Sequence, residues 1–226
     1  MLRIVFLCSG GGGNLRFIAE AIRLGLIVDA EICGVITDRE CPAVLFARQN
    51  NIPVSECDFS EKDQPSVMTR LLDLDPGIIV SNVHKILSSV VVNTFRGKLI
   101  NLHYSLLPAF GCVIGAKALS QALDYGVQLV GTTLHLVDDL VDAGSPVVQT
   151  AIPVIQRDEM PALMDIVFRA GCISLLTGMQ LIREDKQIAL GELCSLVEIS
   201  GRSVLFNPPV TLVPQFQDES FWRRLK

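Results

Sequence analysis

The stretch that decides the fold stands at the start of the chain, where residues 2–26 read LRIVFLCSGGGGNLRFIAEAIRLGL. Residues 2–8 are almost wholly apolar, which is typical of a fully buried strand. A glycine loop follows at residues 9–13, and from Asn14 onward apolar residues recur at the spacing of an amphipathic helix. A strand, a glycine loop and a helix in this order favour an α/β fold built on a parallel sheet.

The glycine loop is a candidate anion site. Backbone N–H groups at the start of a helix have no partner within the helix, and the helix dipole favours negative charge there. The loop is not a dinucleotide fingerprint, because the third glycine position falls on Leu15 or Arg16, and no Gly-Lys-Ser/Thr of a P-loop follows. The alternative interpretation is a tight turn that needs positive φ. We predict a phosphate site formed by Gly11, Gly12, Gly13 and Asn14.

Strands and helices keep alternating along the first part of the chain. We expect strands at residues 31–37, 53–57 and 78–81, and helices at 42–51, 64–74 and 88–95. This order predicts a mostly parallel sheet with helices on both faces.

The pattern changes further along. A helix at 116–125 precedes strands at 129–137 and 146–154, a long helix at 159–182 that breaks or tightens near Gly171, and a hairpin at 196–206. Residues 1–190 are therefore predicted to form one domain, with residues 191–226 as a C-terminal hairpin and tail extension.

Composition and charge exclude several classes of protein. The chain has 226 residues, of which 50% are hydrophobic, so it can bury a sizeable core. No apolar run reaches the roughly 18 residues that a membrane span needs, and the opening residues suit a first strand better than a signal peptide. The net charge is −5 without a basic cluster, which argues against a nucleic-acid surface.

The cysteines and histidines do not form a metal-binding pattern. Seven cysteines are an odd number, they form no CxxC pair, and several stand in apolar runs, which is typical of core residues in a reducing compartment. The three histidines, at 84, 103 and 135, lack the spacing of zinc ligands. We expect a cytoplasmic protein without a metal site.

The strongest catalytic candidate is the segment 98–108, which reads KLINLHYSLLP. Asn101 and His103 are two residues apart on a short apolar strand, so both side chains leave the same face of the sheet. An amide donor beside an imidazole at a strand end can stabilise a developing oxyanion and move a proton. The alternative interpretation is that backbone groups satisfy both polar side chains.

Two further loops are candidate walls of the site. His84 and Lys85 follow the predicted strand at 78–81, and ligands of open α/β sheets bind at the carboxyl ends of the strands. The segment 138–144, DDLVDAG, is an acidic turn. Its carboxylates are either solvated, or one of them points toward the His103 region and acts as a partner in proton transfer.

Taken together, these pieces resemble the 10-formyltetrahydrofolate-dependent formyltransferases, most closely the members that formylate glycinamide ribonucleotide. The resemblance covers residues 2–190 and rests on SGGGGNL, ITDRE, HKIL, NLHYSLLP and GTTLHLVDDLVDAG. It implies the Rossmann-like formyltransferase fold, with an antiparallel part after the catalytic strand. It also implies a catalytic triad on Asn101, His103 and Asp142, a cis peptide at Leu107-Pro108, and the acceptor's phosphate on the glycine loop.

The same resemblance implies the substrates. The donor is 10-formyltetrahydrofolate and the acceptor is a phosphorylated small-molecule amine. From charge, hydropathy and residue spacing we expect no metal and no nucleic-acid or membrane partner, and we expect the chain to be a monomer or homodimer. The folate site falls on two segments, with contacts from Lys85, Ile86, Leu87, Val137, Asp138, Leu140 and Val141.

The chain departs from this family's pattern on the acceptor side. After LLP it has FGCVIG at 110–115, Arg169-Ala170-Gly171 stands where a ribose-binding glutamate is expected, and Ser145 is inserted. Two alternatives remain open: transfer to another amine such as an amino sugar, and a non-catalytic folate- or nucleotide-binding homologue. A third hypothesis, a dinucleotide oxidoreductase, needs a fingerprint that the glycine loop does not provide.

Overall fold

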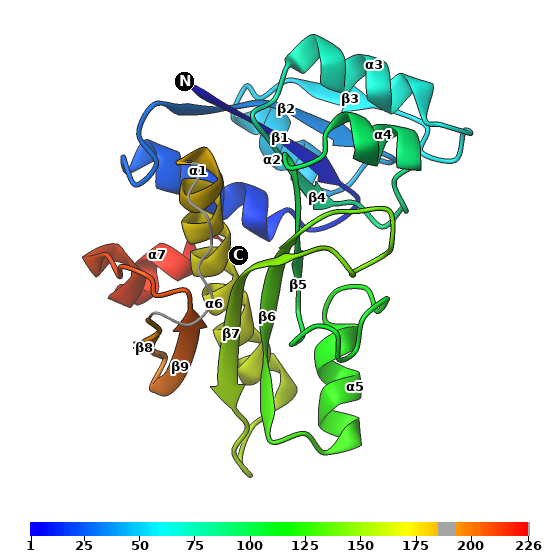
Figure 1. Ribbon diagram of the computed structural model, residues 1–226. Helices are drawn as coiled ribbons and strands as arrows, with labels where there is room; N and C mark the ends of the chain where they lie inside the picture. Colours follow the sequence, from blue (N-terminus) through cyan, green and yellow to red (C-terminus); the bar gives the residue numbers. More distant parts are fainter. Residues whose placement is uncertain (185–192, 226) are drawn as a thin grey trace. The chain divides into compact units, whose positions relative to one another are not determined.

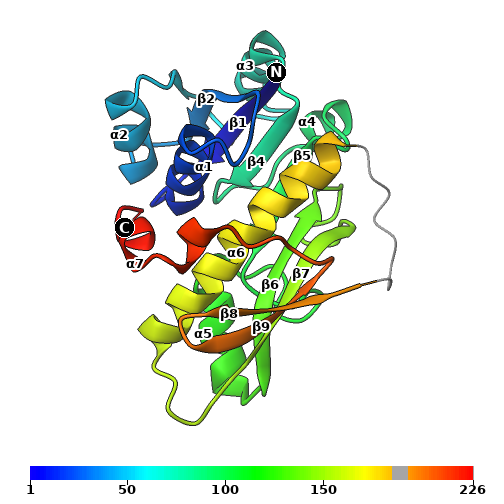
Figure 2. The same ribbon diagram turned by 90° about the vertical axis from the view of Figure 1, so that its left-hand side faces the viewer.

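The computed structural model of the protein describes residues 1–184 and 193–225. The chain forms two compact units (Figures 1 and 2). The first unit consists of Met1–Asn101 with Leu136–Gly144, and the second of Leu102–His135 with Ser145–Lys226. The predicted boundary between residues 190 and 191 lies outside the described residues, so that domain division stays a prediction.

The first unit is a parallel α/β structure. Its sheet has the order β3-β2-β1-β4-β5, and every neighbouring pair of these strands is parallel. The predicted alternation is thus confirmed, with element ends that differ by a few residues. The strands are β1 (Leu2–Cys8), β2 (Ala30–Thr37), β3 (Val54–Glu56), β4 (Ile78–Asn82) and β5 (Leu99–His103), and the helices are α1 (Gly13–Arg23), α2 (Pro42–Gln49), α3 (Pro65–Leu74) and α4 (Ser89–Thr94).

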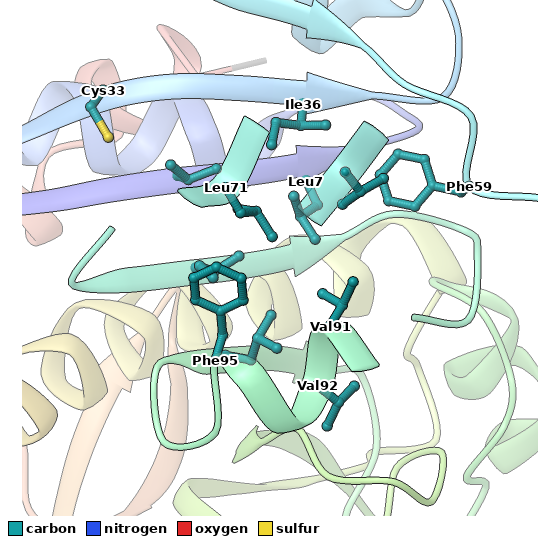
Figure 3. Packing of buried hydrophobic residues seen from close by; sticks show 12 residues of the cluster. Leu7, Cys33, Ile36, Phe59, Leu71, Val91, Val92 and Phe95 are labelled. Atoms are coloured by element: carbon teal, nitrogen blue, oxygen red, sulfur yellow. The ribbon is translucent and has the colours of Figure 1, made fainter. Parts of the chain in front are cut away.

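One face of this sheet packs against α3 and α4. Figure 3 shows Leu7 and Ile36 of the sheet meeting Leu71 of α3 and Val91 of α4, all of them fully buried. Right-handed crossovers place α1 and α2 on the opposite face, because the strand order runs one way from β1 to β3 and the other way from β3 to β5. The order reverses between β1 and β4, so their carboxyl ends form a switch point where ligands of such sheets bind.

The second unit is built on antiparallel strands, as predicted for the part after the catalytic strand. Its strands pair in the order β6-β7-β9-β8, and the hairpin of β8 and β9 joins the sheet through β7. The Leu107-Pro108 peptide is cis, as the resemblance implies. The elements are α5 (Lys117–Tyr125), β6 (Leu129–Leu136), β7 (Pro146–Pro153), α6 (Met160–Arg183), β8 (Ser195–Ile199), β9 (Arg202–Asn207), the 3₁₀ helix η1 (Pro214–Gln217) and α7 (Glu219–Arg223).

Helix α6 runs unbroken over 24 residues, so the predicted break near Gly171 is wrong. This glycine provides space rather than a bend. A Cβ at Gly171 would lie 2.9 Å from Leu102 Cδ2 and 3.4 Å from Tyr104 Cε1. The helix is long and apolar enough to cross a membrane, but 72% of its most apolar window is buried inside the fold, as expected of a core helix.

The C-terminal residues form an aromatic cluster, which no local sequence pattern predicts. Phe216, Phe221 and Trp222 are buried, with ring centroids 5.0–5.9 Å apart. Arg169 of α6 lies over the Trp222 ring at 5.3 Å and binds both carboxylate oxygens of Glu219, at 2.5 and 2.7 Å. These contacts hold α7 against α6.

Candidate active site

The glycine loop combines a structural and an open glycine. Gly12 has φ 74°, and a Cβ there would lie 2.8 Å from Ala43 Cα, so this position needs glycine for the turn and for its packing. Gly11 has no neighbouring atom within 4 Å of an added Cβ, so its surroundings are open. The loop therefore supports both interpretations made from the sequence: a tight turn at Gly12 and room for a ligand at Gly11.

A cation stands beside this loop. The side chain of Arg16, in the first turns of α1, donates from Nη1 to the carbonyl oxygen of Gly11 at 2.7 Å. Its guanidinium also lies 5.7 Å from the centre of the Phe46 ring of α2. In the sequence, Arg16 stands at a position where the dinucleotide fingerprint needs glycine. Its spacing from the glycines, about one helical turn, could have identified it as a candidate anion ligand.

The glycine loop and the loop after β4 meet at the switch point. The Ser9 hydroxyl donates to Asp38 at 2.7 Å and accepts the His84 N–H at 2.9 Å. A Cβ at Gly10 would lie 3.7 Å from His84 Cε1, so the imidazole stands beside the glycine loop. The hydrogen bond from Arg39, joined by that from Ser9, lowers the pKa of the Asp38 carboxyl below its usual value, which keeps it anionic.

The loop that carries Lys85, Ile86 and Leu87 is held by a buried amide. Gln64 Nε2 donates to the carbonyl oxygen of Ile86 at 2.9 Å, and Gln64 Oε1 accepts the Ser88 N–H at 2.9 Å. Leu87 packs against the hydrophobic cluster of Figure 3, while Ile86 is 75% exposed. The role of Gln64 was not predicted from the sequence, because no local pattern indicates that a glutamine side chain reaches a loop more than twenty residues away.

The acidic turn is fixed to the same unit. The Val137 N–H donates to the Leu99 carbonyl at 2.9 Å, and its side chain packs against the cluster that Leu87 also contacts. Both predicted folate segments therefore pack on one cluster. The Asp138 carboxylate accepts the Leu140 N–H at 3.0 Å, and Asp139 accepts from Asn93 and Arg96 of the α4 region. The side chains of Leu140 and Val141 are exposed.

The three residues of the predicted triad are divided between the units. Asn101 of β5 belongs to the first unit and donates from Nδ2 to the Ser81 carbonyl at 2.7 Å. Asp142 also belongs to the first unit and has φ 55° at the end of the acidic turn. His103 belongs to the second unit, is 7% exposed and makes hydrogen bonds at both ring nitrogens, to Ser105 Oγ at 3.0 Å and to the Val113 carbonyl at 3.1 Å.

Comparison with known proteins decides the family. The sequence model of the family described as Formyl transferase matches residues 2–177, a range that spans most of the chain and includes the positions of the predicted triad. The chain belongs to the formyl transferase family.

Within this family, the chain is similar to proteins named phosphoribosylglycinamide formyltransferase and to a larger protein of purine biosynthesis. Phosphoribosylglycinamide formyltransferase of Mycobacterium tuberculosis (strain H37Rv) is 33% identical over 171 residues, which cover 71% of this chain and 75% of that protein. Trifunctional purine biosynthetic protein adenosine-3 of Drosophila melanogaster is 33% identical over 181 residues, but these cover 74% of this chain and only 13% of that protein. The crystal structure of phosphoribosylglycinamide formyltransferase from Anaplasma phagocytophilum superposes with a TM-score of 0.73 at 30% identity, covering 90% of this chain and 92% of that one.

The departures noted in the sequence have structural consequences. In the segment 110–115, Phe110 and Cys112 have φ of 56° and 62°, and the backbone of Val113 contacts His103. Arg169 binds Glu219 and also Asp165, at 2.8 Å. The partner residues in α7 lie beyond the segment that matches the family.

Proposed function

We propose that this enzyme transfers the formyl group of 10-formyltetrahydrofolate to a primary amine, with glycinamide ribonucleotide as the leading acceptor. The observation that carries the proposal is the family match over residues 2–177, which includes Asn101, His103 and Asp142 in the motifs expected of a formyltransferase. Relatives named phosphoribosylglycinamide formyltransferase, at about 30% identity, support the acceptor.

The reaction is an acyl transfer through a tetrahedral intermediate. The acceptor amine attacks the formyl carbon, a carbon–nitrogen bond to the acceptor forms, and negative charge develops on the formyl oxygen. Collapse of the intermediate breaks the bond to the folate nitrogen, which takes up a proton while the acceptor amine loses one. The side-chain amide of Asn101 donates a hydrogen bond to the developing oxyanion, and loss of such a donor typically lowers kcat about a hundredfold or more.

His103 and Asp142 manage charge and protons in this proposal. The charged imidazole stabilises the oxyanion and relays protons through a water molecule. The Asp142 carboxylate orients the ring and favours its charged form. A binding protein without catalysis would not need all three polar groups, and this argues against the non-catalytic alternative.

In this proposal the substrates bind to three loops of the first unit: the loop after β4, the acidic turn and the glycine loop. Lys85 to Leu87 and Val137 to Val141 hold the pterin of the folate, and both segments rest on the cluster shown in Figure 3. The acceptor's phosphate binds at Gly11 to Asn14, where the guanidinium of Arg16 adds a positive charge. We propose a cytoplasmic enzyme, monomer or homodimer, that uses no metal.

A second acceptor is favoured by one observation. Arg169 belongs to the stretch Arg169-Ala170-Gly171, where a carboxylate for ribose hydroxyls is expected, and it is engaged by Glu219, Asp165 and Trp222. Together with the altered segment 110–115, this supports a different amine, such as an amino sugar, as the alternative acceptor.

The test is a spectrophotometric assay of deformylation with a 10-formyl folate analogue, first with glycinamide ribonucleotide and then with amino sugars. The wild type is compared with His103→Ala. We expect turnover with glycinamide ribonucleotide that is lost in the variant. Folate binding by calorimetry without turnover of any amine would reject the proposal and favour the non-catalytic homologue. Turnover with an amino sugar alone would keep formyl transfer and replace the acceptor.

A further inference from the structure

Ser105 joins the imidazole of His103 to the turn that follows β5. It is 4% exposed and lies entirely within the second unit, like the groups that it contacts. Its hydroxyl is 3.0 Å from His103 Nδ1 and donates to the Ala109 carbonyl oxygen at 2.6 Å. The other ring nitrogen, Nε2, is 3.1 Å from the Val113 carbonyl oxygen.

The protons in this chain of contacts can be assigned from the chemistry of the groups. A serine hydroxyl has one proton, and the short contact to Ala109 uses it, so the oxygen can only accept from His103 Nδ1. A backbone carbonyl such as that of Val113 has no proton, so Nε2 must donate to it. Both ring nitrogens then carry protons, and the ring is an imidazolium. Either neutral tautomer would lose one of the three hydrogen bonds.

The position of Ser105 is itself fixed by the hydroxyl group of Thr133, which makes all the hydrogen bonds that it can. Thr133 of β6, which is fully buried, donates from Oγ1 to the Ser105 carbonyl at 2.8 Å. The same oxygen accepts the Leu107 N–H at 3.1 Å and the Gln149 Nε2–H at 3.1 Å. One donated and two accepted bonds use the full capacity of a hydroxyl group. The turn from Ser105 to Leu107 is therefore anchored to the second unit's sheet.

We propose that Ser105 is a positioning residue for His103: its hydroxyl oxygen accepts a hydrogen bond from the Nδ1–H group and donates one to the Ala109 carbonyl, which holds the ring as a double donor. The effect on turnover rests on the proposed function, but the state of the ring does not. Ser105 acts only through His103 and makes no contact with substrate in this proposal. The role differs from that of Asp142, since the Ser105 hydroxyl and the Ala109 carbonyl that follow the ring are neutral groups.

The kinetic test compares three variants by kcat and KM. Ser105→Ala removes the acceptor of the Nδ1 proton, and we expect kcat to fall about tenfold or more with little change in the KM for folate. Ser105→Thr keeps a hydroxyl group and should recover most of this loss. The matched control is Ser174→Ala, because Ser174 is a buried serine of α6 whose hydroxyl has no hydrogen-bond partner among the described residues. It should behave like the wild type.

A measurement without substrate separates this inference from the proposed function. ¹⁵N NMR of the ring nitrogens at neutral pH, with the His103 signals assigned by their absence in His103→Ala, should show both nitrogens protonated in the wild type. In Ser105→Ala the Nδ1 signal should lose its protonated character. A wild-type ring with one unprotonated nitrogen, or wild-type kcat in Ser105→Ala, would overturn the inference. If the wild type formylates no amine, the proposed function fails, and the NMR result alone decides the role of Ser105.

Discussion

Gly144 lies at the end of the acidic turn, and its replacement tests how closely the turn must be placed. The residue is buried, and a Cβ added there would lie 1.8 Å from the carbonyl oxygen of Leu136 and 3.4 Å from the Asp138 nitrogen. These neighbours are backbone atoms at the start of the same turn, so no rotation of a side chain can relieve the clash. Gly144→Ala must therefore move the backbone that carries Asp142.

The size of this displacement sets the expected loss of activity. Real Cβ atoms essentially never approach another heavy atom within 3.0 Å, so a contact of 1.8 Å requires a shift of more than about 1 Å. A misplacement of about 1 Å in a catalytic arrangement can cost about a hundredfold in rate. Because Asp142 is only two positions from Gly144, we expect kcat to fall on that order, while most of the fold persists.

The assay is steady-state formyl transfer, accompanied by thermal unfolding of each variant. Ser145→Ala changes an exposed neighbour and should leave kcat unchanged. Gly178→Ala is a control for overpacking: the nearest neighbours of its Cβ would be side-chain atoms, Leu134 Cδ2 at 2.1 Å and Val147 Cγ1 at 3.4 Å. It should destabilise the fold by about 1–3 kcal/mol with little loss of kcat per folded molecule. Wild-type kcat in Gly144→Ala would refute the role given to the turn and to Asp142.

Two further predictions concern stability. Arg202 binds both oxygens of Asp158, at 2.6 and 3.0 Å, and these hydrogen bonds lower the pKa of the Asp158 carboxyl. The stabilisation is therefore complete above the unfolded-state pKa of about 4 and is lost as the pH falls through the lower folded value. Asp158→Asn should lower the free energy of unfolding by about 2 kcal/mol in urea at neutral pH, and a deficit that does not shrink in acid would contradict this. Glu219→Gln should lower the free energy of unfolding by only about 1 kcal/mol, because that carboxylate is half-exposed. Trp222→Ala should lower it by about 3–5 kcal/mol, because the indole is buried. Equal losses of the two variants in urea denaturation would argue against this account of how Arg169 holds α7.

Local pattern was enough to predict most elements of the fold. The apolar run of β1, the glycines after it and the alternation up to β5 are signals carried by neighbouring residues, and the structure has each element near its predicted place. The wrong prediction of a break in α6 also came from local pattern. Gly171 was interpreted as a helix breaker, but the close approach of Leu102 that it permits is a contact between residues far apart in sequence.

The binding loops show the limit of such reasoning. HKIL and the acidic turn could be identified by their motifs, but Gln64, which fixes the first of them, could not. Asp38 belongs to a quoted motif, yet its contact with Ser9 depends on two strands meeting in the sheet. Contacts of this kind arise only when the chain folds, because residues remote in sequence have no shared local signal.

By itself, the sequence determined the parallel α/β start, the antiparallel continuation and the identity of the candidate catalytic residues, since these depend on residue type, periodicity and short motifs. Only the tertiary structure decided how those residues are held. It placed the Ser105 hydroxyl and the Val113 carbonyl at the two ring nitrogens of His103, and the Ala109 carbonyl at that hydroxyl. It also brought Glu219 of α7 to the buried Arg169, fifty positions earlier in the chain. Hydrogen bonds and ion pairs depend on distance and direction in space, and the order of residues in the chain specifies these only through the completed fold.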